Sequence, residues 1–462
     1  MFKKKWNLPW EMLPAIFSLA WPTMLEQLMQ TGVQYIDTAM VGSLGTQATA
    51  AVGATSTVNW LVSSTIAALG IGFLAFVSQA CGAGDPGKAG RASSQAVLTV
   101  LVCGLLFTAL TLGVSSYVPV WMQVDFDIQA LTAQYFFILY TPMLFRTATI
   151  IFGTLLRAVG DSKTPMCVGI LVNVVNVILN FLLIYPKRTW HGVSLWGASM
   201  GVIGAALASA VSFAVGGVLI TIALWRHPFI SPRGQSLKPD FQILGPCLKV
   251  ALPNALQRFG TSLGYVAFAS MINSIGEVAT AAHTIANTVE SAFYIPGYGM
   301  QTAAATLAGN ALGAQDHKRA NKLAQMIIFL EVGLMVLSGG LLFAFAPQMM
   351  RLFSNDAEVI YLGSVVLRMV ALSEPFYGVA IIIEGMMQGM GNTVMPFVFS
   401  ITGMWGIRIV GTFLCTQLMG MGLISAWACM IAHNMLLFTA FLIYYLTGKW
   451  NPMNRRRILK NN

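Results

Sequence analysis

Charge is scarce in this sequence. Only 9% of its 462 residues are Asp, Glu, Lys or Arg, whereas 56% are hydrophobic. A soluble domain carries about 25% charged residues, so this composition excludes an ordinary soluble protein. It predicts an integral membrane protein in contact with a lipid bilayer. The two polar stretches, 226–238 and the tail after Lys449, are too short to hold a soluble catalytic domain.

Motifs for catalysis and metal binding are also missing. The sequence has no H-E-x-x-H zinc pair, no P-loop and no C-x-x-C. Its six cysteines lie singly in or beside apolar runs, as small hydrophobic core residues do. We therefore expect no enzyme, no cofactor, no metal site and an energy source other than ATP.

The basic residues are unevenly distributed. The formal net charge is +10, yet most Lys and Arg residues fall in alternate loops, such as those at Lys88, Lys163 and Lys318. This positive-inside pattern predicts that both termini are cytoplasmic, which requires an even number of spans. Because membrane topology accounts for the charge, we expect no nucleic-acid partner.

Apolar segments recur along the whole chain, each about as long as the 20 residues that span a bilayer. We expect an all-α integral membrane protein with about twelve transmembrane helices. The segments are roughly 13–41, 50–77, 94–118, 129–155, 165–183, 201–225, 248–273, 280–307, 323–346, 362–387, 396–418 and 422–445. The expected parts are an N-terminal six-helix bundle (1–225), a cytoplasmic linker (226–247), a C-terminal six-helix bundle (248–446) and a basic cytoplasmic tail (447–462).

The two halves are copies of one another. Pro22 and Pro253 are 231 residues apart, and the same offset relates Gly45 to Gly276 and Gly160 to Gly391. Because each half spans six times, both copies have the same orientation, which makes them two parallel bundles. An internal repeat of this kind is typical of membrane transporters. Their substrate sites usually lie near the midplane of the membrane, within or between the repeats.

A polar stripe interrupts the first apolar segment. At about 100° per residue, Glu26, Gln30 and Gln34 fall within roughly 60° of Asp37 around the helix. An ionisable side chain in hydrocarbon costs several kcal/mol and normally faces a bundle interior or a wet cavity. We predict that Asp37 faces a transport cavity lined by the other three. The alternatives are a packing role for Asp37 and interhelical hydrogen bonds for the others.

The second half carries different polar residues. Glu290 and Tyr294 lie on one face of the eighth apolar segment, and Arg258 and Glu384 are isolated charges in the seventh and tenth. We predict that these four also line a substrate cavity. Ordinary core packing is the alternative for the first two, and an internal ion pair is the alternative for Arg258 and Glu384.

The order of these elements resembles the multidrug and toxic compound extrusion (MATE) family over nearly the whole chain. The resemblance rests on a set of motifs in both halves: Pro22 followed by 37–45 (DTAMVGSLG), 157–165 (RAVGDSKTP), 176–180 (NVILN), Leu252-Pro253, 276–283 and Trp405 with Arg408. It implies a secondary antiporter that exports amphipathic, often cationic compounds by alternating access. Asp37 falls on the carboxylate that the family uses for coupling, so the resemblance makes it the main titrating group.

The departures from the family pattern bear on the coupling ion. Asn176 matches a family asparagine, but Asn180 stands where some relatives have a second aspartate. Near Thr261 and Tyr377 the NorM-like branch has acidic sodium ligands, which this chain lacks. The chain therefore resembles the DinF-like branch more, which favours protons over sodium. Asn176 and Asn180 are expected to complete the coupling site, and sodium coupling through Glu290 and Glu384 stays open.

A lipid-linked oligosaccharide flippase of the same wider superfamily is the other alternative. Intramembrane acids outnumber bases in this chain, which favours a cationic cargo over an anionic lipid phosphate. The resemblance also implies a location in the plasma or inner membrane. One chain suffices to build the cavity, so we expect a functional monomer whose partner is a small-molecule substrate.

Overall fold

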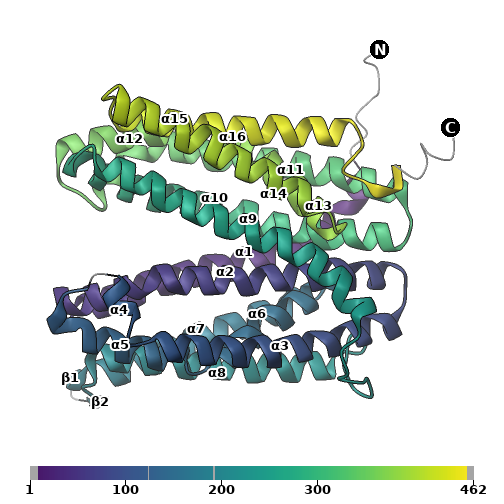
Figure 1. Ribbon diagram of the computed structural model, residues 1–462, viewed down its shortest axis with the longest axis horizontal. Coiled ribbons are helices and arrows are strands. Elements are labelled where there is room, and N and C mark those ends of the chain that lie inside the picture. The colour runs from purple at the N-terminus through teal and green to yellow at the C-terminus, as the bar shows by residue number, and fades with distance from the viewer. Residues whose placement is uncertain (1–8, 123, 191–192, 455–462) are drawn as a thin grey trace. The chain divides into compact units, whose positions relative to one another are not determined.

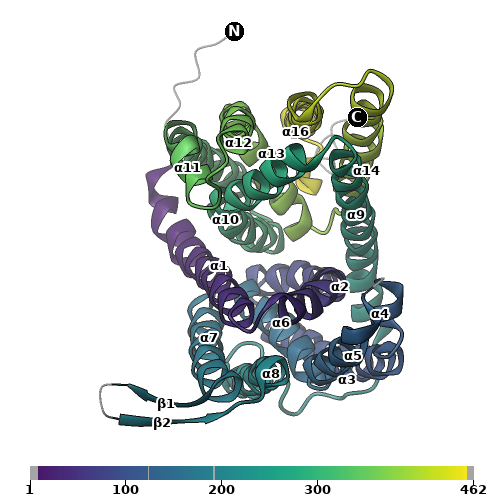
Figure 2. The ribbon, with the colours of Figure 1, turned by 90° about the vertical axis from the view of Figure 1, so that its left-hand side faces the viewer.

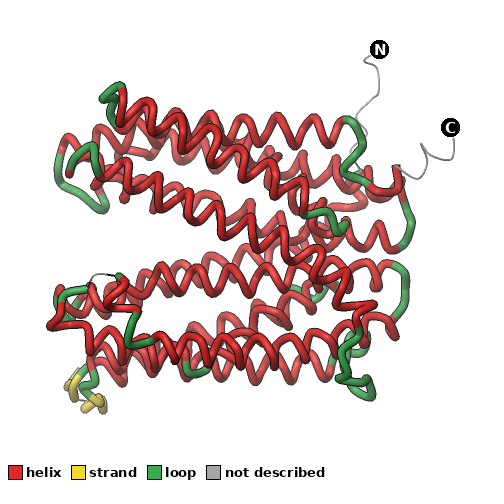
Figure 3. The backbone as a smooth tube through the Cα atoms, in the orientation of Figure 1, coloured by secondary structure: helices red, strands yellow, loops and turns green. Residues whose placement is uncertain are grey.

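A computed structural model describes residues 9–122, 124–190 and 193–454, and within them the fold is almost entirely helical (Figure 1, Figure 3). Residues 1–8 and 455–462, at the two basic ends of the chain, lie outside the described residues. The helices are α1 (Leu13–Gly42), α2 (Thr46–Gly82), α3 (Pro86–Val114), α4 (Val118–Trp121), α5 (Phe126–Tyr140), α6 (Met143–Ala158), α7 (Lys163–Ile184), α8 (Gly201–Arg226), α9 (Phe241–Asn273), α10 (Glu277–Gly313), α11 (His317–Arg351), α12 (Ala357–Ala371), α13 (Glu374–Gly389), α14 (Val394–Ile401), α15 (Val410–Thr412) and α16 (Leu423–Leu446).

Seven of the described helices are long and apolar enough to cross a membrane, or up to nine if each of two bent pairs counts as one span. The pairs are α5 with α6, bent by 48°, and α12 with α13, bent by 54°. Three further helices, α1, α9 and α10, have 30, 33 and 37 residues and contain charged side chains within their apolar runs. Together, the seven helices, the two bent pairs and the three further helices account for the twelve expected segments. Two of these segments are therefore broken rather than continuous.

Two local features were not anticipated by the sequence patterns. The loop after α7 forms an antiparallel hairpin of β1 (Pro186–Trp190) and β2 (Val193–Ala198), which extends from the ends of α7 and α8 in Figure 2. The eleventh span is partly π-helical, at Thr402–Ile409 and Phe413–Leu418. Hydrogen bonds from residue i to i+5 widen a helix and often occur at functional positions.

The chain forms two compact units. The N-terminal unit comprises Leu25–Phe73 and Pro86–Pro246, and the C-terminal unit comprises Met1–Met24, Leu74–Asp85 and Cys247–Asn462. Helices α1 and α2 therefore each contribute to both units. These units are defined by packing, so the bundle boundaries that the repeat predicts stay a prediction.

Small residues let the helices of each unit pack closely. In the N-terminal unit, a side chain on Gly217 of α8 would overlap Phe145 of α6. In the C-terminal unit, a side chain on Gly389 of α13 would overlap the Ala305 carbonyl of α10. Interfaces between membrane helices are enriched in such residues because they allow the backbones to approach.

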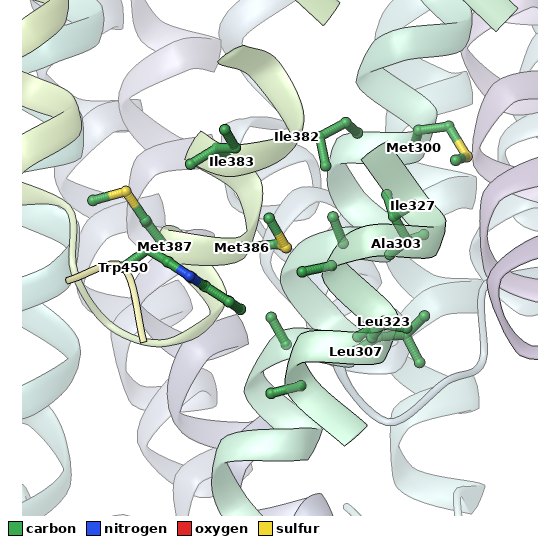
Figure 4. Packing of buried hydrophobic residues seen from close by; sticks show 14 of the residues in the cluster. Met300, Ala303, Leu307, Leu323, Ile327, Ile382, Ile383, Met386, Met387 and Trp450 are labelled. Carbon is green, nitrogen blue, oxygen red and sulfur yellow. The ribbon is translucent and has the colours of Figure 1, made fainter. Parts of the chain in front are cut away.

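Two apolar clusters form the core of the C-terminal unit. The Trp450 cluster, shown in Figure 4, joins α10, α11 and α13 through residues such as Met300, Ile327 and Met386. It also buries Trp450, which follows the last span and stacks on Tyr445 with the ring centres 5.4 Å apart. The Trp427 cluster joins other parts of α10 and α11 to α12 and α16.

Candidate functional site

Asp37 of α1 meets two asparagines of α7 inside the N-terminal unit. Asn180 donates from Nδ2 to Asp37 Oδ1 at 2.6 Å. When the Asn176 amide is oriented to satisfy its neighbours, its Nδ2 donates to the same oxygen at 2.9 Å, and its Oδ1 accepts from Ser209 at 3.2 Å. Asn176 and Asn180 are four residues apart, so one face of α7 presents both amides. Both are buried, with exposed fractions of 6% and 1%.

The structure thus brings together the three residues that the sequence assigns to cation coupling. A carboxylate that accepts two amide hydrogen bonds can stay ionised without a metal ion, and it can release these donors when it binds a proton. Neither amide can titrate, so Asp37 is the only group of the three that can exchange a proton.

A basic group that the site predictions did not include shares a neighbour, Tyr135, with this carboxylate. Arg146 of α6 donates to Asn59 and Ser63 of α2 and lies over the Phe213 ring, 4.9 Å from its centre. Tyr135 interacts electrostatically with both Asp37 and Arg146. Asn59 and Ser63 are four residues apart in an apolar segment, a spacing that could have indicated a polar face on α2.

Glu26 has a different partner from Asp37. Its carboxylate accepts from Arg157 of α6 at 2.6 and 2.7 Å, and both side chains are largely buried. Glu26 also packs against Gly169 of α7. Arg157, in the last turn of α6, therefore forms an ion pair that joins α1 to α6.

Gln30 and Gln34 remain on an exposed part of α1. The backbone carbonyl of Gln34 accepts from the Thr38 hydroxyl at 2.8 Å. Neither glutamine side chain makes a hydrogen bond to any described residue, which leaves both amides available to a ligand or to water.

In the C-terminal unit, Glu384 is bound by amides. Gln257 and Gln388 donate to its Oε1 at 2.8 and 3.0 Å. Arg258 instead donates to Asn254 Oδ1 at 3.0 Å. Arg258 and Glu384 interact electrostatically but form no ion pair within the described part of the chain.

The other two predicted residues of this unit contact each other. The Tyr294 hydroxyl donates to Glu290 Oε1 at 3.0 Å, and the ring of Tyr294 packs edge-on against Tyr377. Arg408, in the π-helical segment, interacts electrostatically with Glu290 and lies over the rings of Tyr265 and Phe268. Arg408 is an isolated charge in the sequence, and nothing in the apolar pattern indicated these aromatic contacts.

Metal ligands do not gather in the described residues: no three His, Cys, Asp or Glu side chains approach one another as a metal site requires. The polar groups instead form two separate networks. One surrounds Asp37 in the N-terminal unit, and the other surrounds Glu290 and Glu384 in the C-terminal unit.

Comparisons with known proteins agree with the repeat. The MatE family model matches residues 22–182 and 253–414, one stretch in each half. The chain is 27% identical to "Probable multidrug resistance protein NorM" of Thermotoga maritima over 98% of this chain and 97% of that protein. It is 25% identical to "Probable multidrug resistance protein YoeA" of Bacillus subtilis over 88% of this chain and 87% of that protein.

Solved structures share the fold. A MATE protein crystallised in complex with MaL6 superposes with a TM-score of 0.87, at 21% identity, over 96% of this chain and 97% of that one. An outward-facing MATE transporter of the MOP superfamily also gives a TM-score of 0.87, at 22% identity, over 95% and 96% of the two chains.

These likenesses confirm the predicted all-helical membrane fold of twelve spans in two repeated halves. They also confirm the predictions of a multi-pass membrane protein that is a transporter and not an enzyme. This chain belongs to the MatE family.

Proposed function

We propose that this protein is a secondary antiporter of the cell membrane that exports amphipathic organic cations in exchange for protons. Relatives named for multidrug resistance support the substrate class. The excess of acidic over basic side chains within the membrane spans supports a cationic cargo. The observation that carries the proposal is the contact of the Asp37 carboxylate with Asn176 and Asn180.

The donors around Asp37 favour a proton over sodium. Sodium, like other hard cations, is bound by several oxygen atoms. Here the amide nitrogens of Asn176 and Asn180 face the carboxylate, so they are placed to stabilise an anion and not to ligate a cation. Protonation of Asp37 removes the charge that these donors hold, and it needs no additional ligand. This argument also supports assignment to the DinF-like branch.

Coupling follows if proton and substrate prefer opposite states. A ligand shifts a conformational equilibrium only by its difference in affinity for the two states. A protonated Asp37 favours the state that closes around the neutral acid. An ionised Asp37 favours the state that admits a cationic substrate. The two ligands then compete for one carboxylate, and each turnover exchanges one for the other.

Transport by purified protein in liposomes tests the coupling ion. The vesicles are loaded with a fluorescent organic cation. The protein should transport this cation when a proton gradient is imposed alone, and it should not transport it when a sodium gradient is imposed alone. The readout is the rate of change in fluorescence, with protein-free vesicles as the background.

Each contrary result has a defined meaning. Movement with sodium alone would replace the proton proposal and direct attention to Glu290 and Glu384. Failure under both gradients, together with binding of pyrophosphate-linked lipids, would favour the flippase. The same vesicles test the proposed monomer, because activity should persist at one chain per vesicle.

We further propose that both termini are cytoplasmic, and cysteine labelling tests this. In a variant without the six native cysteines, Glu277→Cys, at the exposed start of α10, should react with a membrane-impermeant thiol reagent applied outside intact cells. Lys318→Cys, at the exposed start of α11, should react only after the membrane is permeabilised. The reverse pattern would invert the topology.

A further inference from the structure

Three acidic side chains of the C-terminal unit lie between its two apolar clusters. On α10, Glu290 follows Val289 of the Trp427 cluster and precedes Met300 of the Trp450 cluster. On α11, Glu331 lies between Ile327 and Leu342 in the same way, and Glu374 lies between Ala371 and Val379 where α12 meets α13. Along its own helix, each acid thus lies between residues of the two apolar clusters.

Two of these acids have no partner. Glu331 and Glu374 both have an exposed fraction of 0%, and neither carboxyl oxygen of either residue makes a hydrogen bond within the described chain. Burying an ionised carboxylate without a partner costs far more than burying the neutral acid. Both side chains are therefore neutral in this conformation, which means that each carries a proton.

The surroundings of Glu374 differ from those of Glu331. Glu374 interacts electrostatically with Glu290 and Tyr294 of α10. Glu331 packs on the bare backbone of Gly297 and Gly378 and has no ionisable neighbour of comparable effect. Because two adjacent carboxylates resist sharing negative charge, a negative charge on Glu290 would favour the protonated form of Glu374.

Other ionisable groups on the surrounding helices do not neutralise Glu374. Tyr377 of α13 is packed against Tyr294, and Arg408 of the π-helical segment acts on Glu290. His433 of α16 interacts with Arg408. Arg368 of α12 donates to the Phe343 carbonyl and lies over its ring. Arg408 thus interacts electrostatically with Glu290 and not with Glu374.

The position of Glu374 would also allow its carboxyl group to ionise after a movement at the break between α12 and α13. It is the first residue of α13, directly after the 54° break from α12. The helix dipole favours negative charge at this end, although Pro375 has no N–H group and those of Phe376 and Tyr377 already donate to the Ser373 carbonyl. A change in the break that admits water would let Glu374 lose its proton, whereas Glu331 lies inside the continuous helix α11.

We propose that Glu374 holds a second exchangeable proton, in a site of the C-terminal unit separate from Asp37. This inference rests on the proposed proton-coupled antiport and extends it. The proton leaves the Glu374 carboxyl to water when the break between α12 and α13 admits water, and it returns from water before the break closes. Glu290 keeps its hydrogen bond from Tyr294 and its electrostatic interactions with Arg408 and Glu374. Glu331 keeps its proton throughout.

The number of protons exchanged per substrate tests this inference. Purified full-length protein in liposomes is brought to equilibrium at a series of pH differences, with the membrane potential held at zero. The slope of the logarithm of the substrate ratio against the pH difference gives the number of coupled protons. Glu374→Gln should lower the slope by one, so the accumulation ratio at a difference of one pH unit falls about tenfold. Glu331→Gln, an equally buried acid, should keep the wild-type slope.

The outcomes separate this inference from the proposed function. If the wild-type protein shows no proton-driven movement, the proposed antiport fails. If the wild type is driven by protons and Glu374→Gln keeps its slope, Glu374 is a structural acid and the inference is wrong. A slope that depends on sodium and is lost in Glu374→Gln would also overturn it.

A spectroscopic measurement covers the case in which Glu374→Gln does not fold. Infrared difference spectra between substrate-free and substrate-saturated wild type should show a change in the band of protonated carboxyl groups. Glu374→Asp keeps the acid and should shift that band. A spectrum without a carboxyl change, or with a change that Glu374→Asp leaves in place, would contradict the assignment.

Discussion

Replacement of Asp37 by Asn should reduce proton-driven export to the level of protein-free vesicles. Asn keeps the size of Asp but cannot bind and release a proton. Asn176 and Asn180 cannot substitute, because neither amide titrates, although both lie within 2.9 Å of the Asp37 carboxylate. Transport of a fluorescent cation under a pH gradient provides the measurement.

The control for this variant is an acid outside the site. Asp127→Asn changes an exposed carboxylate in the first turn of α5, and its transport should match that of the wild type. The amount of folded Asp37→Asn protein, judged by size-exclusion chromatography, should be unchanged, since a neutral amide is easier to bury than a carboxylate. A folded Asp37→Asn protein that exports at the wild-type rate under the pH gradient would remove Asp37 from the coupling step.

The second large effect is expected at the ion pair between Glu26 and Arg157. Glu26→Gln leaves the mostly buried guanidinium without its anion, and breaking such a pair by removing one partner costs about 3–5 kcal/mol. For a unit of about 200 residues this corresponds to a decrease of roughly 10 °C in the midpoint of thermal unfolding. The midpoint can be measured in detergent by the loss of monodisperse protein on heating.

A double-mutant cycle separates the pair from general packing damage. Arg157→Gln alone should also destabilise the protein, because it leaves the Glu26 carboxylate uncompensated. The double variant Glu26→Gln with Arg157→Gln buries no charge there and should recover most of the loss. If the two single effects simply add in the double variant, the 2.6 Å contact contributes no coupling energy and the prediction is wrong.

The fold was largely predictable because it is dictated by periodic and repeated features. Long apolar segments give the spans, and the 231-residue offset gives the two halves. The breaks in α5–α6 and α12–α13 were not foreseen. Each pair remains apolar across its break, at Thr141-Pro142 and Leu372-Ser373, so hydropathy alone reads each as one helix.

The candidate site was predictable to the extent that it lies on one helix face. Asp37 is conspicuous as an acid in an apolar run, and the four-residue spacing of Asn176 and Asn180 places both amides together. Which polar group meets which is a property of packing between helices. For that reason the sequence grouped Glu26 with Asp37, whereas the structure pairs Glu26 with Arg157. It also gave no sign that Glu331 and Glu374 lie without partners between two dry clusters.

The burial of Trp450 affects how the protein can be handled. The chain does not become a free tail at the end of α16: Trp450 and Met453 are 2% and 8% exposed, and Asn454 donates to the Gly448 carbonyl at 2.9 Å. A purification tag or fluorescent reporter joined directly after Leu446 would displace an aromatic side chain from the core of the C-terminal unit. A fusion point beyond Asn454 leaves this aromatic anchor in place, so reporters for the experiments above should be attached there.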